Sequence, residues 1–188
     1  MQRPTRLVCA ALMLTVSGLA FSQDEGPRWG YIEAGYIDFE PEEGDSDDGG
    51  FDGSSEDGAF AGGSMKIFKM FHIVAEYSDV GDFNFWNAGF GWHGLLGPKA
   101  DLYGTAVWND YDEDDGVSFD AGVRWNVLKW LEVNGQGRWI DLDVGGSDVL
   151  FRVGGMALIL KGRLGFGANW ETGDSDTVRA FARFNFGG

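Results

Sequence analysis

Few residues in this chain of 188 could perform acid–base or nucleophilic chemistry. The sequence contains two histidines, His72 and His93, and a single cysteine, Cys9. We expect both histidines beside short turns at one end of a sheet, where no His–Ser–Asp arrangement can be built from them. A catalytic base has to lie within hydrogen-bond reach of the proton that it removes. The sequence therefore predicts no enzymatic activity, no catalytic residue and no cofactor.

Two acidic runs partly match the spacing of a calcium-binding loop. The first run lacks the oxygen ligand at position 5, and the second lacks the glycine at position 6 and the glutamate at position 12. Neither run has the flanking helices of that motif. We predict solvated acidic loops without a metal site, and a weak divalent-cation rim is the alternative. The candidate ligands are Asp45, Asp47 and Glu56 in the first run and Asp110, Asp112 and Asp114 in the second.

Apolar and polar residues alternate along most of the chain. Across 117–127 the odd positions carry Val, Phe, Ala, Val, Trp and Val, whereas the even positions carry Ser, Asp, Gly, Arg and Asn. A period of two is typical of strands with one apolar face. This alternation predicts ten strands, with eight as the alternative. The predicted strands lie near 28–40, 59–68, 71–79, 84–94, 101–109, 117–127, 131–141, 149–160, 163–171 and 177–186.

The predicted strands are long, and the composition suits a sheet. Strands of soluble proteins usually have about 5–6 residues, whereas a tilted strand needs about 9–11 residues to cross a bilayer. Most of the predicted ranges reach that second length. The 31 glycines disfavour a helical bundle, because each interior glycine costs a helix about 0.8–1 kcal/mol.

The predicted connections alternate in length and charge. Counted from the N-terminus, the odd-numbered connections are acidic and often long, and the even-numbered ones are short and mostly basic. A barrel whose long loops leave one rim and whose tight turns leave the other produces this alternation. We therefore predict an all-β fold, an antiparallel up-and-down transmembrane β-barrel. The bases of the short connections are Lys69, Lys99, Lys129, Lys161 and Arg163.

Aromatic residues recur near the predicted strand ends, on the apolar face. The interval of 31 residues from Tyr77 to Trp108 is repeated to Trp139 and again to Trp170. In a transmembrane barrel such residues form girdles at the two membrane–water interfaces, and the alternative is a buried soluble core. The predicted interface aromatics are Tyr36, Tyr77, Trp86, Trp92, Trp108, Trp125, Trp139, Trp170 and Phe186.

The polar faces of the predicted strands carry charges of both signs. If the alternation holds, these side chains point into the barrel, where buried charges need partners. We predict a network of arginine–carboxylate pairs. This network either plugs the lumen or lines a narrow water-filled path. Its predicted members are Glu33, Glu76, Asp120, Arg124, Glu132, Arg138, Arg152, Arg179 and Arg183.

The N-terminus predicts export. Two arginines precede a largely apolar, uncharged run over 7–21, which suits a signal peptide and is shorter than the roughly 20 residues of a spanning helix. Residues 1–22 are the predicted signal peptide, with cleavage after Ala20 as the alternative, and 23–188 form the barrel domain. Loss of Cys9 with the signal peptide leaves no thiol or disulfide. The net charge of −16 excludes a nucleic-acid partner, which needs a basic surface.

The chain resembles the small outer-membrane β-barrels of Gram-negative bacteria, of the OmpA-like or OmpX-like type. The likeness lies in the segments WGYIEAGY, WNAGFGWH and DAGVRWNV and in the terminal VRAFARFNF. In the last segment, apolar residues occupy every second position up to Phe186, as in the assembly signal of that family. The resemblance implies an outer-membrane location, contact with outer-membrane lipid and lipopolysaccharide, and insertion by the barrel assembly machinery. No catalytic motif comes with it.

Three functions fit these observations. The first is a non-enzymatic outer-membrane barrel with an envelope or surface role. Its acidic extracellular loops are expected to bind an unidentified ligand or to form a weak divalent-cation rim in contact with lipopolysaccharide. The alternative is a small cation-preferring, porin-like channel behind an acidic mouth. The second alternative is a secreted soluble β-sandwich, which requires the alternation over ten segments to be accidental.

Overall fold

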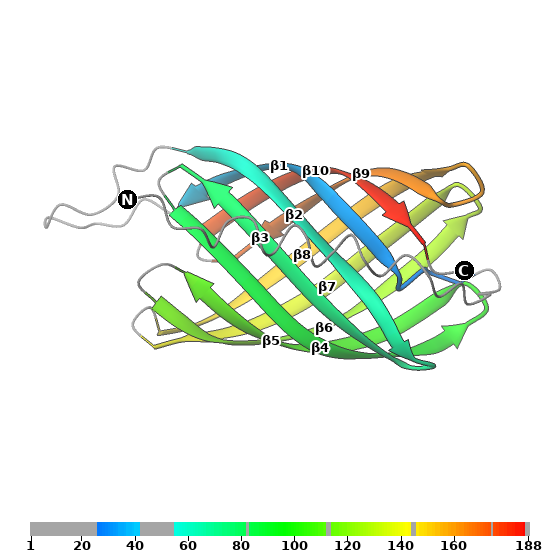
Figure 1. The fold of residues 1–188 in the computed structure, drawn as a ribbon, viewed down its shortest axis with the longest axis horizontal. Helices are drawn as coiled ribbons and strands as arrows, with labels where there is room; N and C mark the ends of the chain where they lie inside the picture. Colours follow the sequence, from blue (N-terminus) through cyan, green and yellow to red (C-terminus); the bar gives the residue numbers. More distant parts are fainter. Residues whose placement is uncertain are drawn as a thin grey trace, which may run out of the picture.

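The computed structural model describes residues 26–41, 55–81, 83–111, 114–143, 146–173 and 175–186. The predicted signal peptide lies outside these residues. Ten antiparallel strands form a closed, up-and-down barrel (Figure 1). The strands are β1 (Tyr31–Pro41), β2 (Glu56–Phe68), β3 (Phe71–Val80), β4 (Phe83–Gly97), β5 (Ala100–Tyr111), β6 (Asp114–Leu128), β7 (Leu131–Leu142), β8 (Gly146–Ile159), β9 (Leu164–Thr172) and β10 (Ser175–Asn185).

Pairing of the first and last strands closes the sheet. Each strand pairs with its neighbours in sequence, and β1 also pairs with β10 from Tyr31↔Asn185 to Pro41↔Ser175. The predicted all-β, ten-strand barrel is thus confirmed. The eight-strand alternative is wrong, and so is the β-sandwich, because a sandwich would leave β1 and β10 as edges. Within the described residues, no helix is long and apolar enough to cross a membrane.

The two ends of the barrel differ in charge. β1 begins and β10 ends at the end that carries the short connections, which we call the basic end (Figure 1). Its five turn bases, Lys69, Lys99, Lys129, Lys161 and Arg163, are all exposed. The opposite, acidic end carries carboxylates such as Asp79, Asp141 and Asp143, which are also exposed.

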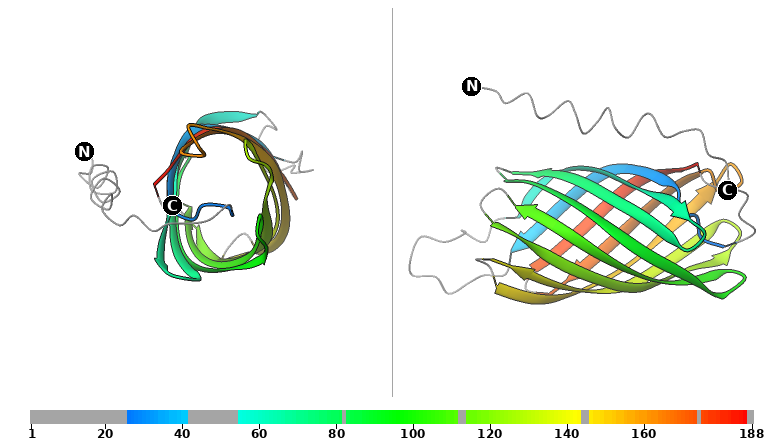
Figure 2. Two further views of the ribbon diagram at one scale, coloured as in Figure 1. Left: turned by 90° about the vertical axis from the view of Figure 1, so that its right-hand side faces the viewer. Right: turned by 60° about the horizontal axis from the view of Figure 1, so that its bottom comes forward.

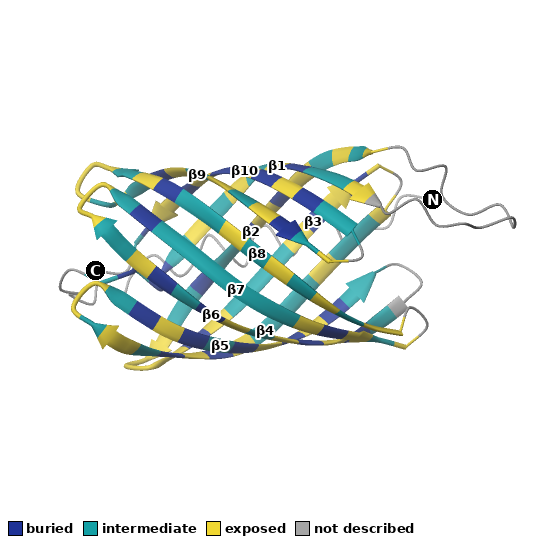
Figure 3. Ribbon diagram, turned by 180° about the vertical axis from the view of Figure 1, so that it is seen from behind, coloured by how far each residue is buried: buried dark blue, intermediate teal, exposed yellow. Residues whose placement is uncertain are grey.

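Burial alternates along the strands as the sequence does (Figure 3). In β10 the outward Val178 and Phe184 are about half exposed, whereas the inward Arg179 and Arg183 are buried. Successive side chains of a strand point to opposite faces of the sheet. The barrel therefore has an apolar outer surface, which we call the apolar belt, and a largely polar interior.

The first strand begins later than predicted. The alternation predicts a strand from residue 28, but β1 starts at Tyr31, and the segment from Gly26 to Gly30 turns across the mouth of the basic end (Figure 2, left). Trp29 is buried against the barrel wall, and its contacts there favour this turn over continued strand pairing. At the other end of the chain, Phe186 lies just beyond β10, and its N–H donates to the carbonyl of Gly30 at 2.9 Å.

The lumen is also less polar than the alternation predicts. Five inward or rim residues, Ile37, Phe60, Val80, Met156 and Phe181, form a buried apolar cluster, with Phe39, Phe85 and Leu158 packed against it. Ile37 and Val80 stand near the acidic ends of their strands. Apolar side chains therefore fill part of the interior, from Ile37 and Val80 near the acidic end to Met156 toward the basic end of β8.

Glycine makes room for a large inward side chain at one point of the wall. Gly91 of β4 pairs with His72 of β3, and a Cβ at Gly91 would collide with the His72 ring and lie 2.8 Å from Oγ1 of Thr105. Gly135 on the outward face offers a contrast, since a Cβ there meets nothing within 4 Å.

We predict that Gly91→Ala lowers the free energy of unfolding by about 1–3 kcal/mol, because overpacking forces a buried ring off its place. The measurement is urea unfolding of the refolded barrel, followed by the heat-dependent mobility shift on electrophoresis. Gly135→Ala is the matched control and is expected to stay within about 0.5 kcal/mol of wild type. Equal losses in the two variants would contradict this account of Gly91.

Candidate functional site

Five arginines and five carboxylates of the described residues meet inside the barrel, and we call them the lumen network. They come from seven of the ten strands, because each occupies an inward position of the alternating pattern. The members are Glu33 of β1, Glu76 of β3, Asp120 and Arg124 of β6, Glu132 and Arg138 of β7, Arg152 of β8, Glu171 of β9, and Arg179 and Arg183 of β10.

Three ion pairs of the lumen network join directly opposed residues on adjacent strands, and the first of them is Glu33 of β1 with Arg183 of β10. Asp120 and Arg138 are register partners of β6 and β7. Nε of Arg138 donates to Oδ1 of Asp120 at 2.6 Å and its second nitrogen donates to Oδ2 at 3.3 Å. Arg152 and Glu171 are register partners of β8 and β9, with nitrogen and oxygen 2.8 Å apart. The two-point contact of Arg138 with both oxygens of Asp120 fixes guanidinium and carboxylate in one plane.

Other pairs reach further around the wall. Arg179 of β10 bonds Glu76 of β3 at 2.8 Å, although β1 and β2 stand between these strands. Besides the directly opposed Glu33 at 2.6 Å, Arg183 lies 3.7 Å from Glu132 of β7. Glu132 in turn lies 2.7 Å from Arg124 of the adjacent β6. The lumen network therefore connects strands that share no backbone hydrogen bonds.

Aromatic rings support the same arginines. The guanidinium carbon of Arg183 lies 4.0 Å from the ring centre of Tyr31, and that of Arg124 lies 5.6 Å from the same ring. The guanidinium of Arg179 lies 5.2 Å from the Phe60 ring. These contacts place desolvated cations against the negative faces of rings, which adds an attraction of about 0.5–2 kcal/mol each.

Little free space remains between the pairs. The interior cavity measures about 120 Å³ and is lined by Arg138, Arg152, Gln136 and Asn169, among others. Nε2 of Gln136 and Oδ1 of Asn169 are buried and have no hydrogen-bond partner in the protein. Since a water molecule takes about 30 Å³ of liquid volume, a few waters fit there and would satisfy these atoms.

A second group, which we call the mouth cluster, closes the basic end. Trp29 is buried, and its indole N–H donates to Oδ2 of Asp101 at 2.6 Å. Its ring stacks on His72 at 4.4 Å and on His93 at 4.6 Å between centres. The guanidinium of Arg124 lies 4.7 Å from the same ring. The mouth cluster thus ties the segment before β1 to β3, β4, β5 and β6.

The two histidines face each other within the mouth cluster. Nδ1 of His72 lies 3.2 Å from Nδ1 of His93, and the Nε2 atom of each ring is buried without a partner. The single contact between them requires one protonated and one unprotonated Nδ1. No serine or carboxylate completes a proton relay here, and Asp101 is held by Trp29.

The structure brings all nine sequence-predicted lumen residues into ion pairs. Sequence reasoning missed Glu171, Asp101 and Trp29, although the alternation contained the signal. Glu171 follows the outward Trp170 and Asp101 precedes the outward Leu102, so both are at inward positions. Trp29 is four residues before the inward Glu33 and therefore on the same face. All three lie at the ends of the predicted strands, where parity is least reliable.

The sequence-predicted interface aromatics lie mostly on the outer surface, between 37% and 48% exposed. Tyr77 and Trp86 are register partners of β3 and β4. Phe186 differs, since it is partly buried beyond the end of β10. The outward, exposed residues are Tyr36, Tyr77, Trp86, Trp92, Trp108, Trp125, Trp139 and Trp170.

The candidate metal ligands are only partly described. Asp45, Asp47 and Asp112 lie outside the described residues, and the side chain of Asp114 does too. Glu56 begins β2 and Asp110 lies near the end of β5. Within the described part of the chain, no three His, Cys, Asp or Glu residues lie close enough together to hold a metal ion.

Comparisons with known proteins bear on the fold. No protein-family model and no curated protein sequence matches the chain. A solved structure of KdgM porin in complex with disordered oligogalacturonate is 9% identical, with a TM-score of 0.50, covering 82% of this chain and 98% of the porin. A second KdgM porin structure gives 8% identity at the same TM-score and the same coverage. The chain shares the barrel fold of this porin. The attachment invasion locus protein Ail of Yersinia pestis is 12% identical over 83% of this chain and 97% of its own, with a TM-score of 0.37.

We predict that Arg138→Met lowers the free energy of unfolding by about 3–5 kcal/mol, because it leaves the Asp120 carboxylate buried without its partner. The double variant Arg138→Met with Asp120→Leu is expected to recover most of that loss, since neither charge remains. Urea unfolding of both single variants and of the double variant measures the coupling. If the double variant loses as much free energy of unfolding as the two single variants together, Arg138 and Asp120 do not stabilise the barrel as a pair.

We also predict that Trp29→Ala opens the basic mouth and exposes both histidines. His72 and His93 are 1% and 5% exposed, so diethyl pyrocarbonate is expected to modify them slowly in wild type and at least several-fold faster in the variant. They are the only histidines of the sequence, so the absorbance change reports on them alone. Trp130→Ala, on an exposed turn, is the control, and an equal rate in both variants would refute the mouth cluster as a closure.

Proposed function

We propose that the chain is an integral outer-membrane β-barrel with a filled lumen, which acts without catalysis as a scaffold for its acidic end at the cell surface. The observation that carries this proposal is the outer surface of the barrel. Large apolar side chains such as Phe90, Phe119 and Phe166 are about half exposed there, whereas the charges face inward in pairs. A soluble protein rarely exposes a continuous apolar surface of this kind, and in lipid it is the expected arrangement.

The distribution of aromatic and charged residues supports an orientation. Trp92 and Trp125 lie toward the basic end of the belt, and Trp108 and Trp139 toward the acidic end. Short turns of such barrels face the periplasm and longer loops face the exterior. We therefore place the acidic end outside, where its carboxylates keep the surface hydrated and available to cations or ligands.

The lumen network argues against a conducting pore. Its five arginines are each bonded to a carboxylate, so the network carries no net charge that would select an ion. An anionic oligosaccharide such as that bound to KdgM porin would have to displace these carboxylates from the arginines. The cation-preferring channel remains the competing function, and the shared fold with a porin is the observation in its favour.

The deciding experiment is planar-bilayer recording of refolded protein that shows the heat-dependent mobility shift. A filled scaffold is expected to give no discrete current steps, whereas cation-selective steps would establish the channel instead. Membrane fractionation of expressing cells tests the location separately. Recovery of the chain in the soluble periplasmic fraction would overturn both functions.

We predict that Phe90→Arg lowers the free energy of unfolding in lipid vesicles by about 2–4 kcal/mol. Phe90 lies on the outer face of β4 between Trp86 and Trp92, where a charge meets the hydrocarbon. Leu160→Arg, in the exposed turn between β8 and β9 at the basic end, is the depth control and is expected to cost about 0–1 kcal/mol. Equal costs at the two positions would indicate that no bilayer surrounds this face.

A further inference from the structure

The rim of the barrel is notched at its basic end. β3 and β4 stop pairing at Phe71↔Trp92, but β4 continues alongside β5 as far as Gly97↔Ala100. The backbone N–H of His93 donates to the carbonyl of Met70 at 2.8 Å and closes the floor of this notch. The resulting pocket, which we call the rim notch, measures about 920 Å³. That is the size of pocket in which proteins bind small ligands.

The rim notch is lined mainly by apolar side chains that the barrel leaves uncovered. Phe68 is 70% exposed, Leu95 74% and Leu96 60%, which exceeds the exposure of the interface aromatics. Turn residues at a barrel rim are normally polar, because they face water. Trp92 and Leu102 continue the apolar lining onto the outer surface of the barrel. The rim notch is thus continuous with the apolar belt.

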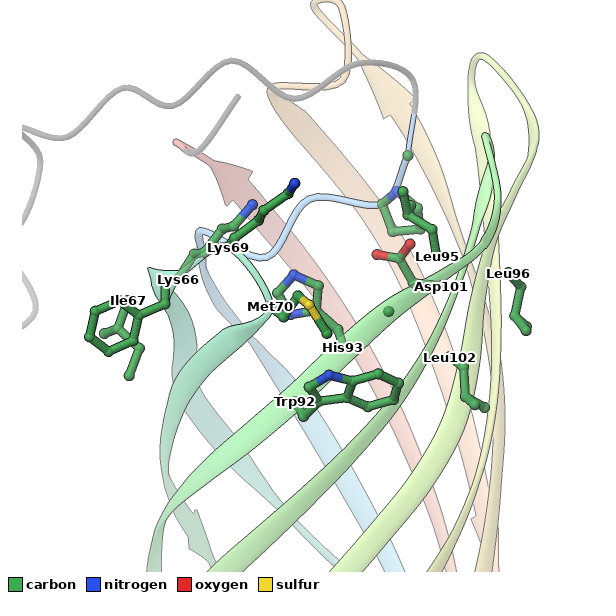
Figure 4. A pocket seen from close by; sticks show the side chains of 14 residues that line it. Lys66, Ile67, Lys69, Met70, Trp92, His93, Leu95, Leu96, Asp101 and Leu102 are labelled. Carbon is green, nitrogen blue, oxygen red and sulfur yellow. The ribbon is translucent and has the colours of Figure 1, made fainter.

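Two lysines flank the rim notch at its open side. Lys66, near the end of β2, and Lys69, in the connection between β2 and β3, extend in the same direction (Figure 4). Asp101 is the one carboxylate among the described lining residues, and it is buried and bonded to Trp29. The exposed Lys69 therefore places positive charge at the rim of the notch, next to an apolar trough.

We propose that the rim notch binds one anionic phospholipid of the periplasm-facing leaflet. The trough takes part of an acyl chain, and Lys69 and Lys66 bind the headgroup phosphate. This inference rests on the proposed outer-membrane function. The arguments for a lipid occupant are the continuity of the trough with the apolar belt and the complementarity of its cationic rim to an anionic headgroup. A zwitterionic lipid lacks the net charge that the lysines would recognise.

The test begins with insertion. Refolded protein is incubated with vesicles of phosphatidylcholine alone, and flotation together with the heat-dependent mobility shift shows whether the barrel has inserted. A chain that does not float would overturn the proposed function and this inference with it. For a chain that floats, the lipid experiment below tests the rim notch by itself.

Lipid binding is then measured by native mass spectrometry of detergent-solubilised barrel, titrated with phosphatidylglycerol or phosphatidylcholine. We expect one phosphatidylglycerol to bind at least about fivefold more tightly than phosphatidylcholine. Lys69→Gln is expected to remove most of this preference, whereas the matched variant Lys129→Gln, in the exposed turn between β6 and β7, retains it. Leu96→Ser is expected to weaken the binding of both lipids.

Two results would overturn the rim notch as the site. Equal affinity of the wild-type barrel for the two lipids would show that the headgroup charge is not recognised. Equal losses in Lys69→Gln and Lys129→Gln would assign anionic-lipid attraction to the ring of turn bases as a whole. All variants are compared only as species that keep the heat-dependent mobility shift, so a failure to fold is not counted as a loss of binding.

Discussion

Closure of the sheet between β1 and β10 is the constraint on which the rest of this structure depends. Once both edges are paired, no strand presents free N–H or C=O groups to its surroundings, so the outer surface can be apolar throughout. Closure also confines every second side chain to one enclosed space. Outward residues then form one apolar surface, and inward residues have to satisfy one another without bulk water.

The lumen network is the solution that this chain uses for its interior. Each buried guanidinium loses its free energy of hydration and must regain it from contacts inside the barrel. A single carboxylate on the adjacent strand is enough where the register places it directly opposite, as with Asp120 and Arg138. Arg179 instead reaches Glu76 on a distant strand, and Arg183 adds a longer contact with Glu132 to its directly opposed partner Glu33. These longer connections brace the wall across the lumen.

Much of this arrangement could be predicted from the alternation of the sequence, because period two fixes which face each residue occupies. It predicted the ten strands to within a few residues and placed Arg138 and Asp120 on the inner face. It did not predict which residues pair across the lumen, since the contact of Arg179 with Glu76 spans 103 positions and depends on the width of the closed barrel. Trp29 was missed for a related reason, because its partners lie on four different strands. The apolar cluster around Ile37 also breaks the pattern, since an enclosed interior accepts apolar side chains wherever they fill space.

Different interactions fill the lumen in different regions, and this difference bears on the proposed scaffold. Apolar packing around Ile37 and Phe60 fills part of the interior, while Trp29 and its hydrogen bond to Asp101 lie across the basic end. Loss of Trp29 alone leaves the ion pairs of the lumen network in place, so opening the mouth does not by itself remove the filling of the lumen. Three unrelated kinds of interaction inside one barrel therefore favour the proposed scaffold over a gated channel.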